Sequence, residues 1–152
     1  MSFTALYLRR RFARSDAIRD FGLTIPDDIT YIRNLPYGSD PEYHILDICF
    51  PKEPTGKLPV IVSFHGGAYV YGSKEVYQFY CADLAKRGFT VINFNYRLAP
   101  RYKFPSPLED ANAVMRWLTE HAEEYPIDLK NVFMVGDSAG AQMASQYAAI
   151  YS

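Results

Sequence analysis

Two kinds of hydrophobic patterning alternate along the chain. Three nearly continuous apolar runs, residues 58–64, 90–96 and 131–136, have the pattern of strands buried on both faces of a parallel sheet. Residues 74–87 and 107–124, which lie between these runs, have the periodicity of helices. The apolar stripe of the second helix consists of Leu108, Ala111, Val114, Met115, Leu118 and Ala122. This alternation predicts an α/β fold with a mostly parallel sheet and flanking helices.

The N-terminal part of the chain has a different pattern. Residues 29–38 and 43–50 are short β-favouring runs with turn-forming residues between them, and they predict an antiparallel pair of strands. Residues 1–21 are weakly helical and polar, and a glycine and a proline then break the helical pattern. We therefore expect an N-terminal arm over residues 1–33 and an α/β unit over residues 34–152.

Composition and charge narrow the range of partners. Of the 152 residues, 49% are hydrophobic, and 16 basic residues against 17 acidic ones give a net charge of −1. Such a chain has no global field that would attract nucleic acid, so a small neutral ligand is the expected partner. No apolar run approaches the roughly 18 residues of a membrane span. The N-terminus does not have the order of a secretory signal, so a cytoplasmic location is expected.

The two cysteines carry no sign of a disulfide or a metal site. Cys49 and Cys81 stand in apolar contexts and belong to no Cys/His pattern with the spacing of zinc ligands. We expect both to be thiols of the core. The chain also has no dinucleotide-binding glycine motif, so no metal and no cofactor are expected.

A glycine-flanked serine follows the third apolar run. The segment "VGDSAGAQM", residues 135–143, has the G-x-S-x-G pattern of a sharp strand-to-helix turn. Such a turn exposes the Ser138 hydroxyl, and Gly136 and Gly140 must be small because strand and helix pass close together. The N-terminus of the helix directs backbone N–H groups to the same place, which favours a developing oxyanion. The pattern indicates a nucleophile, whereas the alternative is that Asp137 or Ser138 only caps the helix.

A second glycine-rich turn, "HGGA", follows the first apolar run at residues 65–68. Its glycines can present backbone N–H groups to a cavity without a side chain in the way, as an oxyanion hole requires. The overlapping "GAYVYGSK" has the G-x-x-x-x-G spacing of a phosphate-binding loop. In that motif lysine follows the second glycine directly, whereas here Ser73 precedes Lys74, so nucleotide binding is disfavoured.

Four blocks of the chain resemble the hormone-sensitive-lipase-like carboxylesterases of the α/β-hydrolase superfamily. The blocks are "HGGAYVYGS", "YRLAP", "FPSPLEDANAVMRWL" and "GDSAG", in the family's order and at about its spacing. The resemblance implies the N-terminal half of an α/β-hydrolase fold that ends after the helix following the nucleophile. It also implies hydrolysis of small acyl esters, and it makes residues 1–33 similar to the cap that covers the active site in this family.

The same resemblance assigns the site residues. Ser138 would be the nucleophile, and His65 would be structural. The oxyanion hole would consist of Gly66, Gly67, Ala68 and Ala139, with Gly66 shaping the loop and the other three donating their amides. Ala68 departs from the family, in which this residue is usually glycine, and its methyl group stands beside the acyl site. Tyr69 and Tyr71 would line an acyl or alcohol pocket, although core packing explains such aromatic residues equally well.

The general base and the acid that a serine hydrolase needs are not found after Ser138. In α/β-hydrolases the chain order is serine, then an acid, then histidine, and the 14 residues after Ser138 contain neither partner. The upstream histidines do not fit this order: His44 lies in an early strand, His65 in the glycine-rich loop and His121 on a solvated helix face. We therefore expect the base and the acid to come from sequence absent here.

A half-sheet would leave the apolar surface of its last strand exposed. A complementing C-terminal half, a homo-oligomer or a longer polypeptide would cover this surface. The alternative function is that of a catalytically incomplete binding protein that keeps the cavity without the chemistry. A peptidase or a thioesterase would also use the same elbow and oxyanion hole.

Overall fold

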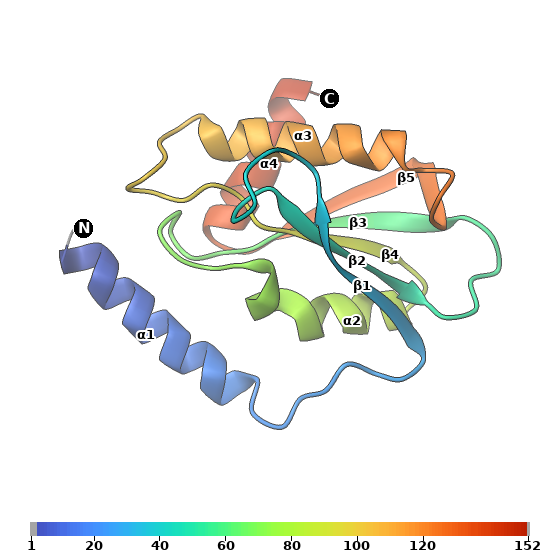
Figure 1. Cartoon of the computed structure of the whole chain (residues 1–152), viewed down its shortest axis with the longest axis horizontal. Coiled ribbons are helices and arrows are strands. Elements are labelled where there is room, and N and C mark those ends of the chain that lie inside the picture. The colour runs from blue at the N-terminus through green and yellow to red at the C-terminus, as the bar shows by residue number, and fades with distance from the viewer. Residues whose placement is uncertain (1–2, 152) are drawn as a thin grey trace.

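A five-stranded sheet with helices on both faces organises the computed structural model, which describes residues 3–151 (Figure 1). The strands are β1 (Ile29–Pro36), β2 (Ile45–Pro51), β3 (Leu58–Phe64), β4 (Thr90–Phe94) and β5 (Ile127–Gly136). The helices are α1 (Phe3–Arg19), the 3₁₀ turn η1 (Lys74–Tyr77), α2 (Gln78–Lys86), α3 (Ser106–Glu120) and α4 (Ala139–Tyr151). The predicted α/β architecture is confirmed.

The strand order is β1-β2-β4-β3-β5. Strands β4, β3 and β5 are parallel, whereas β2 is antiparallel to β4 and pairs with β1 as the predicted antiparallel ribbon. At the carboxyl end of the parallel part, Phe64 of β3 is in register with Gly136 of β5. The segments that leave these two strands therefore begin side by side, at the edge where open α/β sheets bind ligands.

Two apolar layers hold the helices on the sheet. Helix α2 covers one face, where Cys49, Cys81 and Val91 are buried, and both cysteines are free thiols as predicted. Helices α3 and α4 cover the other face (Figure 1). The predicted stripe of α3 is buried there, with Met115 partly buried at its margin.

The last strand differs from its prediction in length and in environment. Strand β5 begins at Ile127 rather than at residue 131, and it is not buried on both faces. Leu129 is 45% exposed and Phe133 is 52% exposed. The physical reason is that β5 lies at the edge of the sheet, with β3 as its neighbour on one side and no strand of the described residues on the other.

Three helical boundaries also differ from the sequence prediction. The helix predicted over residues 74–87 begins as η1 and continues as α2, and the helix predicted over residues 107–124 ends at Glu120. Helix α1 ends at Arg19, and it lies apart from the sheet, beside the loop that follows β3 (Figure 1). Strand β1 runs across the expected domain boundary at residue 33. No helix within residues 3–151 has the length and apolarity needed to cross a membrane.

Candidate active site

The turn between β5 and α4 has the geometry of a nucleophile elbow. Ser138 is exposed and has a φ angle of 49°, in the left-handed region that non-glycine residues rarely adopt. Backbone hydrogen bonds fix this conformation, because the N–H groups of Gly140 and Gln142 donate to the carbonyl oxygens of Asp137 (2.8 Å) and Ser138 (3.0 Å). The serine thus stands at the N-terminus of a 13-residue helix, where the helix dipole is positive.

The two glycines of the elbow are required by close backbone contacts. A Cβ on Gly140 would lie 2.0 Å from the carbonyl oxygen of Phe64, and a Cβ on Gly136 would lie 2.6 Å from the carbonyl carbon of Gly140. Both distances are far below a van der Waals contact, so neither position admits a side chain without a backbone shift. The prediction that strand and helix pass close together here is confirmed.

The glycine-rich loop after β3 turns sharply beside the elbow. Gly67, Ala68 and Tyr69 all have positive φ angles, of 123°, 53° and 58°. The N–H groups of Val70 and Tyr71 both donate to the Gly67 carbonyl at 3.0 Å, which closes the turn. Ala68 therefore adds strain where glycine would have none, on the order of 1–2 kcal/mol for a left-handed residue.

His65 is a neutral, structural side chain at the start of this loop. It is 1% exposed, its ring stacks on Tyr96 with centroids 4.0 Å apart, and the Tyr96 hydroxyl donates to its carbonyl at 2.7 Å. Because the Gly66 carbonyl only accepts, the contact of 2.8 Å makes His65 Nδ1 the protonated nitrogen. Burial lowers the pKa of His65 to about 4, so the ring is uncharged at neutral pH.

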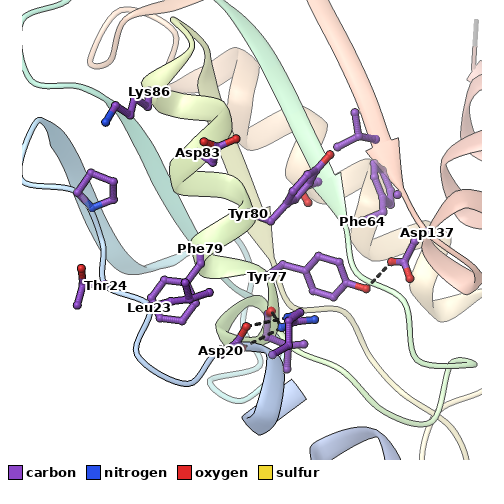
Figure 2. A pocket seen from close by; sticks show the side chains of 16 residues that line it. Asp20, Leu23, Thr24, Phe64, Tyr77, Phe79, Tyr80, Asp83, Lys86 and Asp137 are labelled. Carbon is purple, nitrogen blue, oxygen red and sulfur yellow. Dashed lines mark hydrogen bonds and ion pairs between the residues drawn. The ribbon is translucent and has the colours of Figure 1, made fainter. Parts of the chain in front are cut away.

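Gly66 shapes the loop and does not offer its amide to a ligand. Its N–H donates to the Tyr77 hydroxyl at 3.1 Å, and that hydroxyl donates to the Asp137 carboxylate (Figure 2). A Cβ on Gly66 would lie 2.6 Å from Asp137 Oδ2. The Gly66 amide is thus already used within the protein, which is consistent with the loop-shaping role expected for this residue. Tyr77 carried no signal in the sequence, since no motif includes it.

The two tyrosines predicted to line a pocket lie in different surroundings. Tyr69 borders a cavity of about 350 Å³ together with Phe104, Gln142 and Met143. Tyr71 borders a different cavity, of about 500 Å³. It is also tied to α1, because its hydroxyl donates to Asp16 at 2.8 Å and its ring packs on Phe12 with centroids 5.7 Å apart. Burial and the bond to Asp16 raise the pKa of Tyr71 to about 12.

A cavity of about 810 Å³ lies between α2 and the end of β5. Phe64, Tyr77, Tyr80 and Asp137 lie along its wall (Figure 2). Its size alone does not make it the substrate site, because Gly136 and Asp137 of the elbow line it but Ser138 does not. The cavity at Tyr69 and Gln142 borders the first turn of α4, the helix that begins directly after Ser138.

The other two histidines have partners that are not residues of the elbow. His44 lies in the turn before β2, not in a strand as predicted, and its Nε2 is 3.1 Å from Asp110 Oδ1. His121 follows α3, and its ring stacks on Trp117 with centroids 4.3 Å apart. His121 is half-buried one residue beyond the end of α3, because the ring of Trp117 covers one of its faces.

Comparisons with known proteins place the chain among esterases. The BD-FAE family model matches residues 46–151. The esterase LipI of Mycobacterium tuberculosis is 32% identical over 146 residues, covering 82% of this chain and 46% of LipI. The ethyl acetate hydrolase of Pseudomonas putida is 42% identical over 86 residues, covering 56% of this chain and 27% of that protein.

Solved structures agree with the sequence relatives. Esterase B from Lactobacillus rhamnosis, inhibited by a tributyrin phosphonate, superposes with a TM-score of 0.90 at 29% identity, covering 97% of this chain and 48% of the esterase. The thermostable carboxylesterase EstE1 gives a TM-score of 0.81 at 28% identity, covering 99% of this chain and 51% of EstE1. The α/β-hydrolase fold and the resemblance to carboxylesterases are thus confirmed, and the chain spans about half the length of these relatives.

Proposed function

The chain belongs to the BD-FAE family of α/β-hydrolases, and from that membership we propose that it is the nucleophile-bearing part of a serine carboxylesterase for small acyl esters. One observation carries this proposal: Ser138, with its left-handed backbone, stands beside a glycine-rich loop whose own turn is left-handed at three successive residues. A serine that only capped a helix would need neither the strained elbow nor the facing loop.

The proposed chemistry is acyl transfer through Ser138. Its hydroxyl oxygen attacks the ester carbonyl carbon while a base removes the hydroxyl proton, and the amides of Gly67, Ala68 and Ala139 stabilise the oxyanion of the tetrahedral intermediate. Collapse of this intermediate breaks the ester C–O bond, and the alcohol leaves with the proton. Water then attacks the acyl-enzyme, releases the acid and returns the proton to Ser138. No metal or cofactor takes part in this scheme.

We assign the base and the orienting acid of this reaction to polypeptide outside residues 3–151. The three histidines of the chain are held by Asp110, by Gly66 and by Trp117. The relatives are about twice as long as this chain, and the open edge of β5, with Phe133 exposed, offers a place for further strands. Either a C-terminal half or a second copy would cover that edge, and the length of the relatives favours the C-terminal half.

We further propose that α1 belongs to a cap over the site and that Tyr69 contacts the substrate. Arg9 of α1 donates to the Val70 carbonyl at 2.6 Å, so the N-terminal arm is fastened to the loop that carries the proposed oxyanion amides. The cavity at Tyr69, with its aromatic and apolar wall, suits a short acyl or alcohol group.

The test is the intact mass of the protein that carries this chain, before and after a fluorophosphonate probe. One adduct on Ser138, absent from Ser138→Ala, together with hydrolysis of p-nitrophenyl acetate that Ser138→Ala loses, would support the proposal. If no adduct forms while a small ester binds the wild type and Ser138→Ala equally well, a binding protein without chemistry is the better account.

A further inference from the structure

The hydroxyl of Tyr77 joins two parts of the molecule that the proposed mechanism uses separately. It accepts the N–H of Gly66 at 3.1 Å, in the oxyanion loop, and it donates to Asp137, the residue before Ser138 (Figure 2). A phenol hydroxyl has one proton to donate and lone pairs to accept, so it can serve both partners at once. A side chain without the hydroxyl could make neither bond.

We propose that Tyr77 is a positioning residue that sets the distance between the oxyanion loop and the nucleophile elbow. This inference rests on the proposed function, because the distance matters only if Ser138 attacks a carbonyl whose oxygen the loop binds. Tyr77 does not touch the reacting atoms in this scheme, and it acts through Gly66 and Asp137.

A contact between the loop and the elbow is needed because the pairing of the strands ends before both segments. Pairing of β3 and β5 stops at Phe64 and Gly136, so no ladder bonds hold the two following segments together. Successive positive φ angles at residues 67–69 then turn the loop away from the strand direction. Catalysis by preorganised amides requires donors held within a few tenths of an ångström of the oxyanion, and a free loop would not satisfy this requirement.

The contact of Asp137 with Gly66 makes the tie tight. The Asp137 carboxylate lies against the Cα of Gly66, with no room for a side chain between them. The main chain of Asp137 is fixed too, because its carbonyl accepts the N–H groups of Gly140 (2.8 Å) and Ala141 (3.2 Å) at the start of α4. A displacement of the loop at Gly66 would therefore displace Asp137, the residue next to the nucleophile.

Tyr77 also closes the loop on itself. The loop begins after β3 at His65 and ends with η1, whose last residue is Tyr77. The Tyr77 hydroxyl, at the end of this segment, therefore accepts a hydrogen bond from Gly66 near its beginning. Tyr77 has a φ angle of −107° and a ψ angle of 4°, and this break between η1 and α2 sets the position of its ring. Burial and Asp137 raise the pKa of Tyr77 well above its usual range, so the hydroxyl keeps its proton in any working buffer.

The test compares Tyr77→Phe with wild type in the protein that carries this chain, using p-nitrophenyl acetate. We expect kcat to fall roughly 10- to 100-fold with KM changed less than threefold, because a misplacement on the order of 1 Å costs about 10²-fold in rate while ground-state contacts remain. The matched control is Tyr80→Phe, a half-exposed tyrosine on the same cavity wall, which should retain wild-type kcat.

Asp137→Asn provides the second variant, because it keeps an acceptor for Tyr77 but removes the charge. It should give a smaller fall in kcat, and the double variant should lose no more than Tyr77→Phe alone if both residues act as one unit. Additive losses would overturn the tie. These comparisons remain decisive if Tyr77→Phe folds poorly, since Asp137→Asn alone should still lower kcat at unchanged KM.

Hydrogen exchange separates failure of this inference from failure of the proposed function. Amide exchange over residues 65–72 should quicken in Tyr77→Phe, relative to wild type and Tyr80→Phe, whether or not the protein hydrolyses esters. An active wild type with a Tyr77→Phe kcat within twofold overturns the positioning role. An inactive wild type overturns the proposed function, and unchanged exchange overturns the tie itself.

Discussion

The buried ring of His65 should make stability fall in mildly acidic solution. Burial lowers the pKa of His65 from 6.5 to about 4 in the folded state. Between these two values the unfolded state binds more protons than the folded state, so the free energy of unfolding falls as the pH falls. The linkage relation gives a loss of about 2 kcal/mol at pH 5 and about 3 kcal/mol at pH 4, relative to pH 7.5.

Urea denaturation between pH 7.5 and pH 4.5 measures this loss. With a slope of about 2 kcal/mol per molar urea, the midpoint should drop by about 1 M at pH 5. The comparison variant is His65→Asn, which cannot titrate and whose amide nitrogen replaces Nδ1 as the donor to Gly66. It is less stable at neutral pH, but the pH-dependent part assigned to His65 should be absent.

The control for this measurement is His121→Gln, in which His65 is intact and the dependence should persist. The reasoning would be refuted if wild type and His65→Asn lost the same free energy of unfolding between pH 7.5 and pH 5. That result would mean that the His65 ring is protonated in the folded state without cost, which contradicts its burial against Tyr96.

Three further substitutions or treatments test the packing of the site and the core. Gly140→Ala should lower the melting temperature by roughly 5–10 °C and reduce the proposed esterase activity, because its methyl group would clash with the Phe64 carbonyl and overpacking costs about 1–3 kcal/mol. Gly22→Ala, with no atom within 4 Å but a φ angle of 80°, should cost some stability through backbone strain and change that activity little. Lys74→Met should destabilise the fold, because it removes the 2.9 Å ion pair of the buried Asp47 carboxylate and leaves that carboxylate with the Asn34 N–H and the 3.6 Å contact with Arg33. The loss should stay below the roughly 3–5 kcal/mol of a wholly unpaired buried charge, and adding Asp47→Leu should recover part of it in chemical denaturation. The two cysteines should resist a thiol reagent until urea unfolds the protein, because both are buried and burial raises the pKa of Cys81 to about 12; rapid labelling in native buffer would contradict this.

The parallel core and the two turns at its edge could be predicted from the order of the amino acids alone. Long apolar runs marked β3 and β4 because a strand covered on both faces has few solvent-exposed positions and so carries mainly apolar side chains. Ser138 and the loop at residues 65–68 each follow such a run, and carboxyl ends of parallel strands meet at one edge. The spacing of the glycines around Ser138 predicted the elbow, because the local backbone geometry of such a turn admits only small residues at those positions.

The contacts that hold these parts together could not be predicted, because they join residues that are far apart in the chain. Tyr77 and Asp137 are 60 residues apart, and Tyr71 and Asp16 are 55 apart, so neither pair leaves a local pattern in the chain. Their contacts depend on β3 lying next to β5 and on α1 lying over the loop, which the order of elements does not fix. For the same reason the apolar run of β5 did not indicate that this strand lies at the edge of the sheet. An apolar side chain is favoured in a buried position, but its hydrophobicity does not specify which segment buries it.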